Sequence, residues 1–313
     1  MVASPASHVS EPSSTGPSTA SISSDIYPFQ GQFVEVGGHR YHYLDEGEGE
    51  PVVMVHGNPS WSIYYRQLVL ALRGKHRCLV PDHIGCGFSD KPSDADYEYS
   101  IRQRIEDLES FLEQVGANKN ITLIVHDWGG MIGMGWAARN PGAVKRIVIL
   151  NTAAFHLPKS KALPAALWLC RDTKFGAFMV RRFNAFSYFA TWVACRKASM
   201  SAALREAYCA PYNSWDNRIA TLRFVQDIPL KPGDRGYELI TEVQDALSQF
   251  KEIPKMICWG MKDFVFDHHF LDTWLEHWPE AEVHRFEDCG HYILEDAQEE
   301  ILELVQSFIE ANP

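Results

Sequence analysis

The sequence predicts an α/β protein with a mostly parallel, doubly wound sheet, helices on both faces and an inserted helical cap. Short apolar runs recur without polar alternation, which is typical of strands covered on both faces. Helical patterns separate most of these runs, and this alternation of strand and helix favours a parallel sheet. Residues 154–227 break the alternation, because they contain helical patterns and no strand pattern.

Eight segments carry the strand pattern. The first two are joined by a turn that includes Gly37 and Gly38, which predicts a hairpin. The eight predicted strands cover residues 33–36, 41–44, 51–55, 78–80, 121–125, 146–150, 255–259 and 282–286. Among the core helices, residues 100–115 form an amphipathic pattern with Ser100 as the expected N-cap, and residues 297–311 form the last helix.

The 313 residues suit one α/β domain with an inserted subdomain. We expect residues 28–153 and 228–313 to form the core and residues 154–227 to form the cap. The helical patterns of the cap cover residues 167–171, 175–189 and 192–208. The alternative is that these helices extend the core. Residues 1–27 are rich in Ser and Pro and are predicted to form a disordered tail, because they bury too little apolar surface to order themselves.

The composition argues against several classes of function. The net charge is −11, whereas nucleic-acid binding needs clustered positive charge. The chain has no run of 18 apolar residues and no secretory signal pattern, so no membrane span is expected. The seven Cys lack zinc or disulfide spacing, which favours reduced thiols in the cytoplasm. Without a zinc-protease or P-loop motif we expect no metal or cofactor. The sequence leaves open whether the chain forms a homo-oligomer.

The middle of the chain has the layout of a nucleophile elbow. Residues 125–129 read Val-His-Asp-Trp-Gly, follow an apolar run and open a Gly-rich helical stretch. Such a strand-to-helix turn pushes one side chain above the sheet, and its usual occupant is Ser. Here the occupant is Asp127. A carboxylate nucleophile forms an ester with the carbon it attacks, so the sequence predicts displacement at a saturated carbon that carries a good leaving group.

Two uncharged donors are expected beside this aspartate. Asn58 follows the strand at residues 51–55, and its backbone amide together with that of Trp128 is expected to form an oxyanion hole. The side-chain NH₂ of Asn58 and the indole N–H of Trp128 are also predicted to hold a departing anion. The competing interpretations are a turn residue before Pro59 for Asn58 and core packing for Trp128.

Hydrolysis of an ester on Asp127 requires a base that activates water. Among 13 His, His291 follows the last predicted strand and precedes the final helix, where a hydrolase of this architecture places its base. Asp263 follows the strand at residues 255–259 and is predicted to orient that His, which gives the chain order nucleophile, acid, His. Asp267 is the alternative acid.

Together these motifs resemble the haloalkane dehalogenase family of α/β-hydrolases. The matching segments include His-Gly-Asn-Pro-Ser-Trp at residues 56–61, and the others are residues 81–92, 125–130, 259–263 and 290–291. The resemblance implies an α/β-hydrolase fold with a cap. It also implies five roles, which are a nucleophilic Asp127, the base His291, the acid Asp263, and halide-stabilising Asn58 and Trp128.

A narrower likeness concerns the substrate. One subfamily holds both dehalogenases and the β-lactone decarboxylases of long-chain olefin biosynthesis. The segments similar to it are residues 131, 151–155, 210–212, 221–229 and 263–267. A halide leaving carbon and the carboxylate released when a β-lactone opens at its alkyl C–O bond are both anions. Asn58 and Trp128 therefore suit either leaving group.

The leading hypothesis is a haloalkane dehalogenase. Asp127 displaces halide, His291 activates water against the ester, and alcohol, halide and a proton leave. The alternative is a β-lactone decarboxylase that makes long-chain cis-alkenes. The expected partners are a small apolar substrate, either haloalkane or β-lactone, and a halide ion. An epoxide hydrolase would need two cap tyrosines, for which the candidates are Tyr188, Tyr208 and Tyr212. A non-catalytic scaffold would lack the nucleophile or the base, and both are present.

Overall fold

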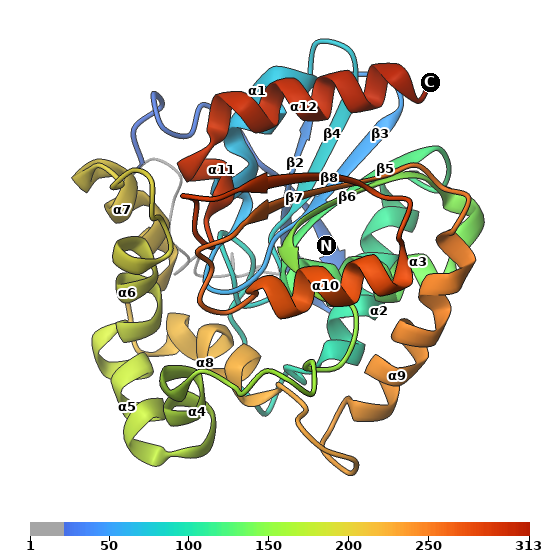
Figure 1. Cartoon of the computed structure of the whole chain (residues 1–313). Helices are drawn as coiled ribbons and strands as arrows, with labels where there is room; N and C mark the ends of the chain where they lie inside the picture. The colour runs from blue at the N-terminus through green and yellow to red at the C-terminus, as the bar shows by residue number, and fades with distance from the viewer. Residues whose placement is uncertain (1–21) are drawn as a thin grey trace, which may run out of the picture.

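A computed structural model of the chain describes residues 22–313, and Figure 1 shows a mostly parallel sheet between two layers of helices. The eight-stranded sheet has the order β1-β2-β4-β3-β5-β6-β7-β8. The strands are β1 (Gln32–Val36), β2 (His39–Glu46), β3 (Pro51–Val55), β4 (Arg77–Pro81), β5 (Ile121–Asp127), β6 (Val144–Thr152), β7 (Lys255–Gly260) and β8 (Glu282–Phe286). Only the pairs β1–β2 and β2–β4 are antiparallel, so the predicted fold class is confirmed.

Helices cover both faces of the sheet (Figure 1). Helices α1 and α12 pack on one face, and α2, α3, α9 and α10 pack on the other. Successive side chains of a strand point to opposite faces, so Leu123 and Val125 of β5 enter one core while Ile124 enters the other. The bounds are α1 (Arg66–Leu72), α2 (Ile101–Gln114), α3 (Trp128–Arg139), α9 (Tyr237–Ala246), α10 (His268–His277), α11 (Ile293–Asp296) and α12 (Gln298–Ala311).

The core helices begin where the sequence predicts. The hydroxyl of Ser100 accepts a hydrogen bond from the backbone N–H of Gln103 at 3.2 Å, which caps α2.

Gly133 of α3 lies against β5, where a Cβ would stand 2.7 Å from a methyl carbon of Val125. The glycines of α3 thus permit close helix–sheet packing.

Five further helices lie between β6 and β7 and form a layer beside the core, on the left of Figure 1. They are α4 (Ala165–Asp172), α5 (Lys174–Phe183), α6 (Ala185–Val193), α7 (Ala202–Cys209) and α8 (Ile219–Gln226). We refer to them as the cap helices. The helix predicted over residues 175–189 is interrupted at Asn184, which adopts a left-handed conformation with φ 52°.

The continuous helix predicted over residues 192–208 is wrong in its middle, because residues 194–201 are not helical. Helix α6 ends at Val193 and α7 begins at Ala202. The buried carboxylate of Asp296 accepts hydrogen bonds from the backbone N–H groups of Arg196, Lys197 and Ala198, at 2.7, 3.0 and 3.1 Å. This tertiary contact competes with helix formation in the intervening segment, and sequence periodicity does not report it.

The predicted tail at residues 1–27 falls mainly on residues 1–21, which lie outside the described residues. Its last residue, Tyr27, is buried, and its hydroxyl lies 2.7 Å from the Ser62 hydroxyl. The packed chain therefore includes Tyr27. Within residues 22–313, no helix has the length and apolarity needed to cross a membrane.

Replacing Asp296 by Ala should lower the free energy of unfolding by at least about 3 kcal/mol, because it removes several hydrogen bonds to a charged acceptor, each worth about 1.5–3 kcal/mol. The carboxylate also accepts from the backbone N–H of Gly290 at 2.7 Å. Chemical denaturation measures the change. The control is Glu287→Ala, because Glu287 is exposed, and it should change the free energy of unfolding by less than about 0.5 kcal/mol. Equal effects of the two substitutions would contradict this account.

Candidate active site

Asp127 stands at the turn between β5 and α3. Its backbone has φ 51° and ψ −125°, a conformation that a non-glycine residue rarely adopts and that costs roughly 1–3 kcal/mol. Close packing holds this turn, because a Cβ on Gly129 would stand 1.9 Å from the carbonyl oxygen of Val55. The Thr152 hydroxyl also donates a hydrogen bond to the carbonyl oxygen of Asp127. The geometry is that of a nucleophile elbow.

Backbone amides face the Asp127 carboxylate. The N–H of Asn58 donates to Oδ1 at 2.6 Å, and the adjacent N–H of Trp128 also lowers the pKa of the carboxyl group. The neighbouring Gly57 permits this approach, since a Cβ there would lie 2.0 Å from Oδ1. Two amides aimed at one carboxyl group form the arrangement expected of an oxyanion hole.

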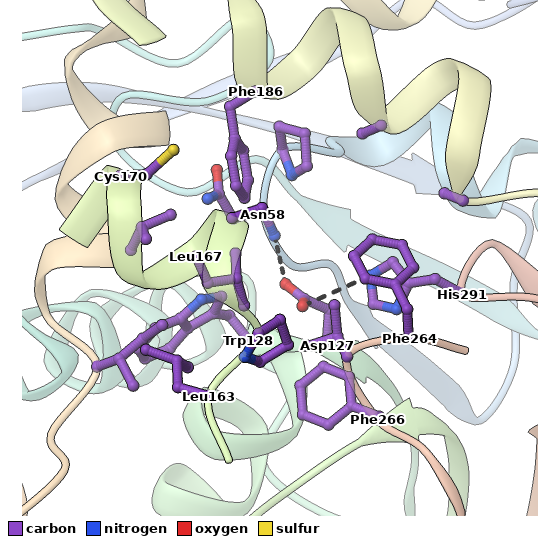
Figure 2. A pocket seen from close by; sticks show the side chains of 18 of the residues that line it. Asn58, Asp127, Trp128, Leu163, Leu167, Cys170, Phe186, Phe264, Phe266 and His291 are labelled. Atoms are coloured by element: carbon purple, nitrogen blue, oxygen red, sulfur yellow. Dashed lines mark hydrogen bonds and ion pairs between the residues drawn. The ribbon is translucent and has the colours of Figure 1, made fainter. Parts of the chain in front are cut away.

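The imidazole of His291 lies on the other side of the same carboxylate (Figure 2). Its Nε2 is 3.6 Å from Oδ2 of Asp127, and its Nδ1 is 2.8 Å from Oδ2 of Asp263. All three side chains are buried. The structure therefore brings together the residues that the sequence assigned as nucleophile, base and acid.

Asp263 is oriented by a residue whose contribution sequence analysis missed. Asn151, at the end of β6, donates from Nδ2 to Asp263 Oδ2 at 3.1 Å, and its Oδ1 accepts from the N–H of Gly260 at 2.7 Å. Asn151 also has a positive φ, 33°. The signal available in the sequence was a polar residue at a strand end, next to the strand that carries the acid.

The alternative acid does not contact His291. The Asp267 carboxylate is engaged by Lys161, at 2.5 Å, and by the imidazole of His269, at 3.0 Å. Asp267 also caps α10, since its Oδ1 accepts from the backbone N–H of His269 at 3.1 Å. Its observed role is thus at the start of that helix, as is expected of an N-cap aspartate.

Two other histidines near the site have structural partners. His126 Nε2 lies 2.9 Å from the carbonyl oxygen of His291, and His56 Nδ1 lies 2.8 Å from that of Gly57. Both rings are fully buried, and burial is the main cause that lowers their pKa values. They are held neutral and support the backbone around the nucleophile.

The surroundings of Asp127 and His291 shift the pKa values of both side chains from their ordinary values. Burial raises the pKa of Asp127 to about 6, although His291 and the amides of Asn58 and Trp128 act in the opposite direction. For His291, burial disfavours the charged ring, but the carboxylates of Asp263 and Asp127 outweigh it, so its pKa is raised. A buried carboxyl group and an imidazole that shift each other's pKa values are typical of catalytic sites.

The side chains of Asn58 and Trp128 border the same space. Asn58 Nδ2 donates to the carbonyl oxygen of Thr221 in α8 at 3.0 Å, which leaves one of its two N–H groups for a ligand. Trp128 lines the cavity, and its ring centre lies 5.4 Å from that of Phe224. The predicted anion-holding role of these two side chains remains a prediction.

A cavity of about 530 Å³ extends from Asp127 between the core and the cap helices. Leu163, Leu167, Phe186, Phe264 and Phe266 surround the carboxylate (Figure 2). The lining side chains that carry a nitrogen, oxygen or sulfhydryl group are Asn58, Asp127, Trp128, Cys170 and His291. The cavity thus suits a largely hydrocarbon substrate with one reactive group at Asp127.

No tyrosine is among the residues that line this cavity in the described chain. The Tyr208 hydroxyl donates to Glu295 at 2.5 Å, and the Tyr212 hydroxyl donates to the Ser60 carbonyl at 3.1 Å. Tyr188 is half-exposed. The pair of tyrosines that an epoxide hydrolase needs is therefore not provided by these three candidates.

The fold, the elbow and the Asp127–His291–Asp263 arrangement are those of an α/β-hydrolase. A model of the alpha/beta hydrolase fold family matches residues 50–298. The chain belongs to this family, within the group that contains the cis-3-alkyl-4-alkyloxetan-2-one decarboxylases and the haloalkane dehalogenases. The predicted resemblance is confirmed.

Its relatives differ in their reactions. The chain is 59% identical to the cis-3-alkyl-4-alkyloxetan-2-one decarboxylase of Shewanella oneidensis, over 91% of this chain and 89% of that protein. It is 48% identical to the enzyme of the same name from Xanthomonas campestris, over 87% and 92%. Identity falls to 27% with haloalkane dehalogenase 2 of Mycobacterium bovis, over 88% and 93%.

Solved structures share the fold. The haloalkane dehalogenase of Bradyrhizobium elkani superimposes with a TM-score of 0.80, covering 90% of this chain and 98% of that one, at 23% identity. This likeness establishes the common architecture. The reaction has to be argued from the site and from the nearer relatives.

Replacing Asp263 by Asn should lower the pKa of His291, because the neighbouring carboxylate is the largest influence that raises it. Turnover should fall by about 10²-fold, since the imidazole loses its orienting charge. NMR titration of the His291 ring measures the pKa. Asp267→Asn is the matched control and should leave that pKa unchanged. A shift of equal size in the control would show that Asp263 has no special role.

Proposed function

We propose that this protein decarboxylates cis-3,4-dialkyl β-lactones, which are oxetan-2-ones, to cis-alkenes. The observation that carries the proposal is the 59% and 48% identity, over nearly the whole chain, to two proteins named cis-3-alkyl-4-alkyloxetan-2-one decarboxylases. Identities to proteins named haloalkane dehalogenases are 27–31%. The sequence favoured dehalogenation, and these identities favour its alternative. The apolar cavity around a single nucleophile also supports the lactone.

In the first step Asp127 opens the ring. An oxygen lone pair of its carboxylate forms a bond to C4 of the lactone, and the C4–O1 bond breaks with its electrons going to the ring oxygen. The substrate is then held as an ester on Asp127 and carries a new carboxylate. The free N–H of Asn58 and the indole N–H of Trp128 are the donors available to that anion.

In the second step the ester collapses without water. The bond between C3 and the carboxylate carbon breaks and releases CO₂, its electrons form the C3=C4 double bond, and the C4–O bond returns its electrons to Asp127. Displacement inverts C4, and an anti elimination then gives a cis-alkene from a cis-lactone. The sequence of steps consumes neither water nor a proton and regenerates the nucleophile.

The cavity favours this outcome over hydrolysis. The negative charge of a carboxylate disperses as CO₂ leaves, so a dry, apolar surrounding favours decarboxylation. The phenylalanines and leucines around Asp127 offer no polar group to hold the water that would cleave the ester to a β-hydroxy acid. In this scheme His291 mainly supplies positive charge, which favours the ionised form of Asp127.

Dehalogenation is the second candidate, because the same nucleophile, base and acid would perform it. It differs in needing water at the ester carbonyl, with His291 as the base. The two reactions can therefore be distinguished by their products and by whether they require His291.

Incubation with a cis-3,4-dialkyl oxetan-2-one should give the cis-alkene and CO₂, measured by gas chromatography. Asp127→Asn should lower the rate by at least about 10³-fold, because the amide is a poor nucleophile. Bromide release from 1,2-dibromoethane is the parallel assay. If bromide release is faster than alkene formation, or if β-hydroxy acid is the main product, dehalogenation or hydrolysis is the correct function.

His291→Phe should separate the two chemistries in one variant. With 1,2-dibromoethane the Asp127 ester should accumulate, because no base activates water, and intact-mass spectrometry detects it. With the lactone the protein should remain unmodified while alkene still forms, more slowly, because losing the imidazole raises the pKa of Asp127 further. A persistent lactone adduct without alkene would contradict a water-independent collapse.

The rate of ring opening should depend on the ionisation of Asp127. Its pKa of about 6 means that the nucleophile is charged above that pH and is progressively neutralised below it. We expect kcat/KM for alkene formation to reach a plateau above about pH 7 and to fall about tenfold per unit well below pH 6. A rate that stays constant from about pH 4.5 to pH 8 would contradict this assignment.

A further inference from the structure

On the outer surface of the cap, large aromatic side chains are exposed to solvent and small polar side chains are buried. Helix α6 buries the small polar residues Ser187 and Thr191 and exposes Tyr188, Phe189 and Trp192, the last at 53%. A surface helix that meets water normally shows the opposite arrangement. Such an exposed aromatic surface marks an interaction site.

Helix α5 extends this surface. Gly176 and Val180 face inward, whereas Phe175 and Phe178 are exposed and lie about one turn apart. The ring of Phe178 also lies 5.9 Å from that of the exposed Phe183. We define the cap aromatic face as Phe175, Phe178, Phe183, Tyr188, Phe189 and Trp192.

The active-site cavity opens on this face. Phe175 and Phe189 line the cavity that reaches Asp127, yet they are 63% and 59% exposed. Residues that border both the cavity and the solvent stand at its mouth. The aromatic surface therefore borders the route between Asp127 and the outside, together with Leu169, Val193 and Phe264, which also line the cavity and are exposed.

Positive charge accompanies the aromatic rings. Residues 154–227 contain eleven Lys and Arg against four Asp and Glu, a net charge of +7 in a chain whose net charge is −11. The guanidinium of Arg205 lies 3.9 Å from the ring centre of Trp192, and that of Arg182 lies 5.3 Å from that of Phe183. A partner that covers this face should be both apolar and anionic.

We propose that the cap aromatic face docks on the surface of an anionic lipid bilayer. Aromatic rings favour the headgroup level of a bilayer, and Lys and Arg favour its phosphates. The mouth of the cavity would then meet the acyl chains. Delivery of an apolar lactone from the bilayer to Asp127 is a consequence of this docking and rests on the proposed function.

A second copy of this chain fits the face less well. Two caps placed face to face would oppose like charges, because Lys174, Arg182 and Arg205 of each copy have no acidic partner among the ion pairs of the described residues, whereas Lys161, Arg171, Lys197 and Arg223 pair with acids outside the cap segment. Outside residues 154–227, the large hydrophobic residues that are exposed in the described chain are Phe33, Leu230 and Phe264. The acidic core therefore offers no comparable apolar area to the cap.

Vesicle flotation tests the docking. The full-length protein should float with vesicles of phosphatidylcholine and phosphatidylglycerol, and less with phosphatidylcholine alone or at high salt.

The double variant Phe178→Ser with Trp192→Ser should lower the partition coefficient by at least about tenfold, because each ring loses apolar burial. Lys174→Glu with Arg182→Glu should weaken binding to anionic vesicles. None of these four residues lines the cavity.

Phe33→Ser is the matched control, because Phe33 is exposed on β1, outside the cap helices. It should leave flotation unchanged. The proposal is overturned if the wild type fails to float, if the control lowers binding as much as the double variant, or if binding ignores lipid charge. It is also overturned if ultracentrifugation shows a stable oligomer without lipid that the double variant dissociates, which would assign the face to a second copy.

Two substrates separate this proposal from the proposed function. The double variant should turn over a short-chain, water-soluble lactone as fast as the wild type. It should be slower by about tenfold on a long-chain lactone presented in anionic vesicles, because fewer molecules are bound there. Vesicle binding without lactone turnover would overturn the reaction and leave the docking intact. Turnover of both substrates without vesicle binding would overturn the docking alone.

Discussion

The site depends on one constraint, the burial of the Asp127 carboxylate at a strained turn. The backbone at φ 51° directs the side chain off the end of β5, and glycines on both sides allow the neighbouring chain to close around it. Burial makes the charged form costly and raises its pKa to about 6. The surrounding donors offset part of that cost. The oxyanion amides and the imidazole of His291 are thus required by the nucleophile itself before any substrate is bound.

This constraint connects the core and the cap. Asn58 reaches the carboxylate with its backbone and the carbonyl oxygen of Thr221 in α8 with its side chain, so the cap helices help to orient an active-site residue. Asp296 holds the backbone of Gly290, beside His291, and also the segment that comes after α6. The cap therefore does more than cover the cavity, because its attachment points are the neighbours of Asp127 and His291.

Much of the fold was predictable, because the central strands are short apolar runs and the chain order of Asp127, Asp263 and His291 matches the order of the strand ends. The segment after α6 was not, since the carboxylate of Asp296 that fixes it is distant in sequence. Asn151 entered the sequence analysis only within the segment at residues 151–155, although it hydrogen-bonds Asp263, which follows the neighbouring strand. Local patterns specify elements and strand ends, but partners supplied by tertiary contacts are not encoded locally.

The choice between the two reactions rests on the fate of the ester. Halide displacement and lactone opening use the same nucleophile, the same donors and the same buried charge, so these features alone do not distinguish them. Hydrolysis needs a water molecule beside His291, whereas loss of CO₂ needs only that the new carboxylate sit in an apolar surrounding. The cavity walls are nearly all hydrocarbon, and the mouth is framed by exposed aromatic rings. An apolar cavity around a buried carboxylate is consistent with the proposed reaction, which uses no water.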